Sequence, residues 1–135
     1  MKKIYYTALI YMIVGLLSGI YEREFTKAMH FTGYSMLSIL HTHLLILGMF
    51  FFLLVLVIEK SWKLTENKLY NLFFWTYNIG VTWSVLFLAI HGTMTVLGKT
   101  VGPAVSGLAG FGHMILTAGL ILFFVLLKER ITVKN

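Results

Sequence analysis

The sequence has no cysteine, no aspartate and a single proline, and only 12% of its residues are charged. Without cysteine, the chain forms no disulfide, offers no thiolate to a metal and attaches no haem covalently. Ordinary soluble domains have about 25% charged and about 45–50% apolar residues. This 135-residue chain is 59% apolar, with a mean hydropathy of +0.85. The composition therefore predicts an integral membrane protein whose apolar surface faces lipid.

Four apolar segments are long enough to cross a bilayer, because the hydrocarbon core requires about 20 helical residues. They cover residues 4–20, 34–58, 69–97 and 104–127. The first segment is longer than the apolar part of a signal peptide and lacks a small-residue cleavage site, so we expect a retained helix. No internal repeat or linker divides the chain. The prediction is an all-α four-helix bundle, a single domain over residues 1–135, with Pro103 at the start of the last helix.

The basic residues predict the orientation, because Lys and Arg favour the cytoplasmic side of a membrane. Eight of the eleven lie at the termini or between the second and third segments: Lys2, Lys3, Lys60, Lys63, Lys68, Lys128, Arg130 and Lys134. The other three are Arg23, Lys27 and Lys99. We therefore expect both termini in the cytoplasm and the protein in the plasma membrane. The formal charge of +6 lies at helix ends and does not indicate nucleic-acid binding.

Glycines on the first and last segments predict close helix packing, because small residues let helices approach each other in lipid. The first segment has Gly15 and Gly19 one turn apart. The last segment has four: Gly107, Gly110, Gly112 and Gly119.

Histidines are the main functional signal. With both termini inside, His41, His43, His91 and His113 fall on three different spans in the outer half of the bilayer, and His30 lies on the outer connection. Ionisable residues inside a span are rare and usually mark a site, and imidazole is a common ligand of haem iron, copper and zinc. The alternative is that each histidine only hydrogen-bonds between helices.

The spacing of His41 and His43 restricts the site. Residues two apart on an α-helix lie about 200° apart around its axis. The two imidazoles therefore point to opposite faces of the helix and do not chelate one ion. If both are ligands, they serve two sites.

The neighbouring residues favour haem b over a bare ion. Zinc would require a cysteine or carboxylate that these spans lack. Copper is the alternative, because methionine sulfur lies near the histidines in sequence, at Met29, Met36, Met94 and Met114. A porphyrin would instead occupy an apolar aromatic slot, with small residues close to its faces. The chain offers aromatics at Phe50, Phe51, Phe52, Trp83, Phe87 and Phe111, and glycines at Gly48, Gly92, Gly110 and Gly112.

The run His41-Thr42-His43, followed by Gly48-Met49-Phe50, resembles the His-x-His helix of haem-copper oxidase subunit I. That subunit has three arcs of four helices, and this chain resembles one arc. It is also similar to a family of small four-helix bacterial membrane proteins of unknown function. The resemblance implies that His41 and His43 are axial ligands of two different haems. His91 is followed by Gly92, so the oxidase's paired copper histidines have no counterpart, and proton-pumping oxygen reduction is not implied.

The resemblance also implies an assembly. In a ring of three chains, His41 of one protomer and His43 of its neighbour would clamp one haem, which predicts a homotrimer. Within one protomer, a helix-two histidine would instead pair with His91 or His113. His30, His91 and His113 would otherwise anchor propionates or form a second metal site. We expect electron transfer, or haem or gas binding, rather than catalysis, with an unidentified redox partner. The rival classes are a copper or other metal-ion carrier and a structural accessory subunit.

Overall fold

The computed structural model describes residues 1–134, with side chains through Thr132; Asn135 of the predicted domain lies outside the described residues. The elements are α1 (Lys2–Ala28), α2 (Leu37–His43), the π-helix η1 (Leu44–Phe50), α3 (Phe51–Trp62), the 3₁₀ turn η2 (Leu64–Glu66), α4 (Leu69–Val96) and α5 (Pro103–Lys134). α2, η1 and α3 run on as one helix, so four helices are long and apolar enough to cross a membrane. The described residues contain no strand. The predicted all-α fold of four long helices is confirmed.

Several predicted boundaries differ from the observed helix ends. α3 ends at Trp62 rather than residue 58, and α5 ends at Lys134 rather than residue 127. α1 continues beyond Ile20 to Ala28, and the rings of Tyr21 and Phe25 stack on this added part with centroids 5.2 Å apart. The second helix begins at Leu37 rather than Tyr34, because the Ser35 hydroxyl instead accepts a hydrogen bond from the Leu37 amide. Pro103 begins α5, as predicted.

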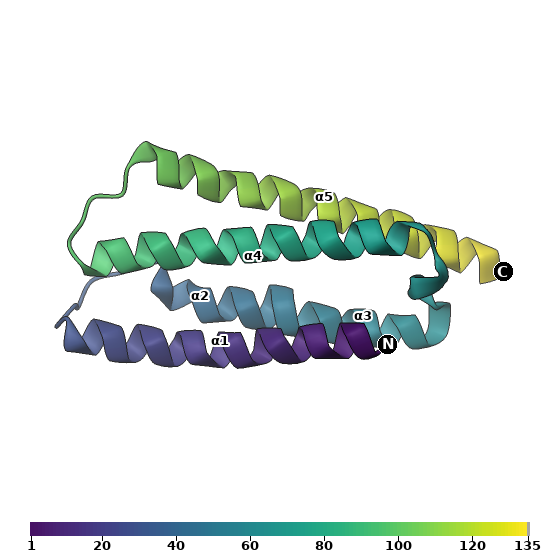
Figure 1. Cartoon of the computed structure of the whole chain (residues 1–135), viewed down its shortest axis with the longest axis horizontal. Coiled ribbons are helices and arrows are strands. Elements are labelled where there is room, and N and C mark those ends of the chain that lie inside the picture. Colours follow the sequence, from purple (N-terminus) through teal and green to yellow (C-terminus); the bar gives the residue numbers. More distant parts are fainter. Residues whose placement is uncertain (135) are drawn as a thin grey trace.

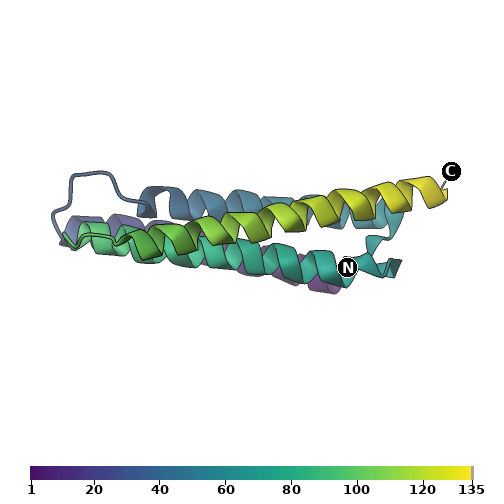
Figure 2. The same ribbon diagram turned by 90° about the horizontal axis from the view of Figure 1, so that it is seen from above.

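The helices form an open, staggered row in which sequence neighbours are antiparallel (Figure 1). α1 packs against the second helix, the second helix packs against α4, and α4 packs against α5. Both termini and η2 lie at one end of the bundle, which we call the terminal end. Loops 29–36 and 97–102 lie at the opposite end, which we call the connection end (Figure 1). α4 lies between α2 and α5, and the first turns of α5 are set apart from α2 (Figure 1), whereas the C-terminal part of α5 crosses towards α3 (Figure 2).

An aromatic core fixes the terminal half. Phe52, Phe73 and Tyr77 are fully buried. Phe51 stacks on Tyr77 with centroids 4.1 Å apart and meets Phe123 at 5.2 Å. Three of the four long helices therefore meet here, and the arrangement of the connection half follows from the way each helix leaves this cluster.

Glycine contacts hold α4 and α5 together. A Cβ atom at Gly80 would lie 2.6 Å from the backbone nitrogen of Leu116, and one at Gly119 would lie 2.8 Å from the Cα atom of Tyr77. Gly112 makes a similar contact with Ser84. The predicted packing role is confirmed for Gly112 and Gly119.

The same role is confirmed for Gly15, which packs against Leu45, and Gly19 lies at ordinary contact distance from His41. The prediction of close helix packing is wrong for Gly107 and Gly110. No atom lies within 4 Å of a Cβ placed at either position, because both face away from α4.

Candidate functional site

His43 ends α2, and its imidazole has a defined tautomer. Nδ1 lies 2.9 Å from the carbonyl oxygen of Ile39, one turn earlier. A carbonyl only accepts hydrogen bonds, so Nδ1 carries the hydrogen, and in the neutral ring Nε2 keeps a free lone pair. Histidines that bind metals are usually held in this way, with the second ring nitrogen donating to a backbone carbonyl.

His113 repeats the arrangement on α5. Its Nδ1 lies 3.1 Å from the carbonyl oxygen of Ala109, also one turn earlier. The side chain is exposed, and its Nε2 has no protein partner among the described residues. In a membrane, this nitrogen would face hydrocarbon, where an unpaired polar atom is costly.

Both histidines lie on helices that pack against α4. The π-helix separates His43 from Phe51, which contacts Tyr77 of α4 and Phe123 of α5. His113 is two turns from Leu120, which packs against the buried core. The opposite flank of α5 meets Trp83.

Helix contacts also fix their depths. Leu37 lies level with Gly92, since a Cβ there would be 2.5 Å from the Leu37 nitrogen, and Gly112 lies level with Ser84. Counting along antiparallel helices, His43 is level with α4 residue 86 and His113 with residue 83. Three residues correspond to about 4.5 Å along a helix. The two imidazoles therefore lie at nearly the same depth.

His41 and His91 have a different kind of environment. Each has a buried Nδ1 atom with no hydrogen-bond partner. His41 faces α1, where its Cβ and Cγ atoms lie 3.7 Å from the Cβ position of Gly19. His91 lies on the row of α4 that includes Ser84, about 12 Å closer to the connection end than His113. Buried polar atoms without partners are uncommon, and both occur at histidines that the sequence analysis selected.

His30 stands apart from the other histidines. It is exposed in the loop after α1, with a left-handed φ of 51°. Across residues 1–134, no three side chains of His, Glu, Asp or Cys converge in a geometry that would hold a metal ion. The second metal site from His30, His91 and His113 therefore stays a prediction.

Most of the predicted porphyrin slot is filled by protein. A Cβ at Gly48 would lie 2.3 Å from the Tyr11 ring, Gly92 is covered by Leu37, and Gly112 is covered by Trp83 and Ser84. The prediction that these three glycines admit a porphyrin was wrong, because neighbouring helices occupy the same space.

Gly110, one turn before His113, remains open, with nothing near its Cβ position. Phe51 and Phe52 belong to the terminal core. The aromatic residues closer to the histidines are those of the α4–α5 contact, where Trp83 lies 5.3 Å from Phe87 and 6.0 Å from Phe111 between ring centroids.

Sequence reasoning missed the π-helix that follows His43. It allows the Tyr11 ring to lie over Gly48, and its Leu47 carbonyl oxygen accepts a 3.0 Å hydrogen bond from the Tyr77 hydroxyl. π-turns are rare and occur frequently at functional sites. No residue pattern marks this one, although Gly48 is the small residue that a close ring contact requires.

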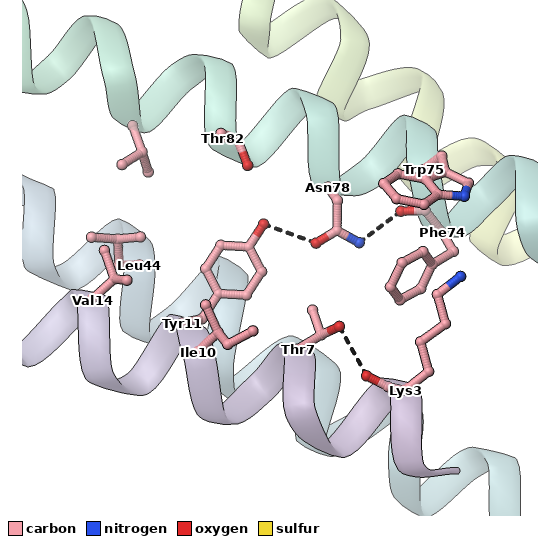
Figure 3. A pocket seen from close by; sticks show the side chains of 11 residues that line it. Lys3, Thr7, Ile10, Tyr11, Val14, Leu44, Phe74, Trp75, Asn78 and Thr82 are labelled. Carbon is pink, nitrogen blue, oxygen red and sulfur yellow. Dashed lines mark hydrogen bonds between the residues drawn. The ribbon is translucent and has the colours of Figure 1, made fainter.

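A second feature that the sequence analysis missed is a groove between α1 and α4 with a volume of about 530 Å³. Its walls are mainly apolar, but Tyr11 and Asn78 meet inside it, with the Tyr11 hydroxyl donating a 2.9 Å hydrogen bond to the Asn78 Oδ1 atom (Figure 3). Near the terminal end, the Lys3 ammonium lies 3.9 Å from the centroid of the Phe74 ring. An asparagine at mid-span was the available sequence signal, since such residues are costly in lipid.

Comparison with known families matches residues 1–130 to a family described as a protein of unknown function (DUF2871). No curated protein matches the chain, and no solved structure matches it. The resemblance to an oxidase arc therefore stays a prediction.

Proposed function

The chain belongs to this family, whose description assigns no activity, and we propose that it is a membrane protein that binds b-type haem through His43 and His113. Its termini would lie in the cytoplasm, because eight of its eleven Lys and Arg residues are at or near the terminal end. This is the intraprotomer form of the haem site, in which both axial ligands come from one chain.

The matched state of the two imidazoles carries the proposal. On two helices that both pack against α4, and at nearly one depth, Nδ1 donates to its own helix and Nε2 is left without a protein partner. In the neutral imidazole, this hydrogen bond fixes the tautomer in which Nε2 is the ligand atom. Nothing in a purely structural role requires the second nitrogen to remain unpaired in lipid.

The residues present fit a porphyrin better than a bare ion. A single metal ion requires three or four donors at bonding distance, and the described residues bring no such group together. A porphyrin supplies four of its own nitrogens, so the protein has to add only one or two imidazoles. Gly110 leaves open space on α5 one turn before His113.

When bound between two imidazoles, haem iron exchanges single electrons. The chain would tune this exchange by keeping the site apolar and by fixing both rings against rotation. His91, closer to the connection end, would hydrogen-bond a propionate through its unpaired ring nitrogen. With both axial positions filled, electron transfer is favoured over catalysis, and gas binding would require one imidazole to leave.

The trimeric alternative uses His41 instead of His113. The position of His41 against α1 makes this pairing less favourable, because the imidazole would have to leave its own bundle to reach a neighbour. Loss of haem would then depend on His41 rather than on His113.

The test is an absorption spectrum of the full chain, purified in detergent after expression with ample haem. We expect a Soret band and sharp reduced α and β bands, lost in His43→Ala and His113→Ala. His30→Ala, which changes an exposed loop residue, is the matched control and keeps the spectrum. A colourless but folded wild-type protein, or full haem content in both Ala variants, would overturn the proposal. Haem loss in His41→Ala but not in His113→Ala would select the trimer.

A further inference from the structure

The groove between α1 and α4 contains two polar levels. Lys3 and Thr7 lie near the terminal end, and the Thr7 hydroxyl donates a 2.9 Å hydrogen bond to the Lys3 carbonyl oxygen. Tyr11, Asn78 and Thr82 form the deeper level (Figure 3). Eight residues separate Lys3 from Tyr11, which is about 12 Å along a helix. The deeper group therefore lies about two turns from the Lys3 backbone and one turn beyond the Phe74 ring that the Lys3 ammonium covers.

Hydrogen-bonding capacity remains unused at the deeper level. The Asn78 amide donates once, to the Phe74 carbonyl oxygen at 2.7 Å, although a side-chain amide has two hydrogens to donate. Its second hydrogen has no acceptor among the described residues.

Thr82 also differs from other threonines of the bundle. Thr95 and Thr117 donate to the carbonyl one turn earlier on their own helices. The Thr82 hydroxyl is instead turned towards the Tyr11 hydroxyl (Figure 3). This hydroxyl hydrogen-bonds to Tyr11, and because it rotates, it is able to donate to a ligand instead.

The depth of this group decides which lipid-soluble molecule it recognises. Asn78 lies nine residues from the start of α4, or about 13 Å along the helix. The 28 residues of α4 extend about 42 Å, beyond a hydrocarbon core of about 30 Å, so Asn78 lies below the interface but short of mid-membrane. A phospholipid bound in the groove would keep its phosphate at the interface, beside Lys3, and its deepest polar groups, the ester carbonyls, only accept hydrogen bonds. The deeper group offers an acceptor, the Tyr11 oxygen, as well as donors, so a ligand matched to it carries an uncharged group that both accepts and donates.

We propose that this groove binds the ring of a lipid-soluble quinone or quinol. A quinone carbonyl oxygen would accept hydrogen bonds from Asn78 Nδ2 and the Thr82 hydroxyl, and a quinol hydroxyl would donate to the Tyr11 oxygen. The flat ring matches the aromatic side chains of Phe74 and Trp75 in the wall, and the isoprenoid tail would leave through the open side of the groove. The site is independent of the histidines and requires no haem.

The experiment titrates the full chain in detergent with decylubiquinone and follows tryptophan fluorescence. Quinones quench indole emission on contact, and among the three tryptophans only Trp75 lines this groove. We expect saturable quenching that Trp75→Phe removes. Thr82→Val, which replaces the hydroxyl by a methyl group, is expected to raise the Kd about tenfold, the loss of one hydrogen bond. The control is Thr117→Val, where the lost bond lies on α5.

Two results would overturn the proposal. One is an equal Kd for the wild type and Thr82→Val, or full quenching in Trp75→Phe. The other is a phospholipid that native mass spectrometry finds bound to every chain and that decylubiquinone does not displace. A Soret band is not a readout here, so the haem proposal and the quinone proposal fail separately.

Discussion

Replacing Gly80 by Ala tests the α4–α5 contact, on which the placement of His113 depends. The new Cβ would lie 2.6 Å from the nitrogen and 2.7 Å from the Cα atom of Leu116. Carbon atoms in good contact are about 3.5–4.0 Å apart. Because both contacted atoms belong to the backbone, no rotamer change relieves the clash, and the two helices must separate by about 1 Å.

The cost follows from this separation. Overpacking a well-packed site costs about 1–3 kcal/mol, and a clash with backbone atoms belongs at the upper end. Alanine in place of glycine returns about 1 kcal/mol of helix propensity. We therefore expect Gly80→Ala to lower the free energy of unfolding by about 2 kcal/mol.

Gly107→Ala is the matched control, because it makes the same change on α5 where nothing lies within 4 Å. Gly107→Ala retains only the gain in helix propensity. The free energies of unfolding of the two variants should therefore differ by about 3 kcal/mol, roughly a hundredfold in the unfolding equilibrium. The assay is SDS titration of the protein in micelles, followed by near-ultraviolet circular dichroism and tryptophan emission. Trp83 donates a 2.8 Å hydrogen bond to the Leu108 carbonyl, so its emission reports this interface. Equal midpoints for Gly80→Ala and Gly107→Ala would refute a close α4–α5 approach.

Two further predictions concern other contacts. Tyr77→Phe removes the hydrogen bond to the Leu47 carbonyl and should destabilise the protein by about 1–3 kcal/mol, since it leaves a buried acceptor unpaired; an unchanged SDS midpoint would contradict this. Outside the spans, hydrogen bonds from Lys63 and Arg130 hold the pKa of Glu66 below its ordinary value of 4.5. A carboxyl group with a lowered pKa stabilises the fold above pH 4.5. This stabilisation is lost as the pH falls through the pKa of the folded state. The SDS midpoint of Glu66→Gln should therefore change less than that of the wild type as the pH is lowered through this range. Parallel plots of midpoint against pH for the two proteins would exclude the ion pairs of Glu66.

The fold was largely predictable because lipid makes the spans obvious. A run of about 20 apolar residues has few alternatives to a membrane helix, and each predicted segment falls mainly within an observed long helix. The helix ends were less predictable. α1 continues through Glu22, Arg23 and Glu24, because a helix is free to extend into water beyond the bilayer, where charges cost nothing.

The candidate site was only partly predictable. Selecting the histidines required just their rarity within spans. Deciding which helix covers Gly92, or that Gly110 lies open, depends on the way α4 crosses its neighbours, and residue spacing on one helix contains no such information. For the same reason, the opposition of His41 and His43 was derivable from the 200° rule, but the assignment of His41 to the α1 side was not.

The π-helix is one reason why the direction of the His43 side chain was not predictable from the sequence. Its extra residue changes the angular relation between the part of the helix above it and the part below it by about one α-helical position, or 100°. Phe51 and Phe52 are fixed below it by the aromatic core, and His43 stands immediately above it. A helix of regular α geometry drawn through residues 37–62 would therefore give His43 the wrong direction relative to α5. The Tyr77–Leu47 hydrogen bond and the Tyr11 ring on Gly48 hold the wide turn open. These two tyrosines thus act as positioning residues for an imidazole that neither of them is required to touch.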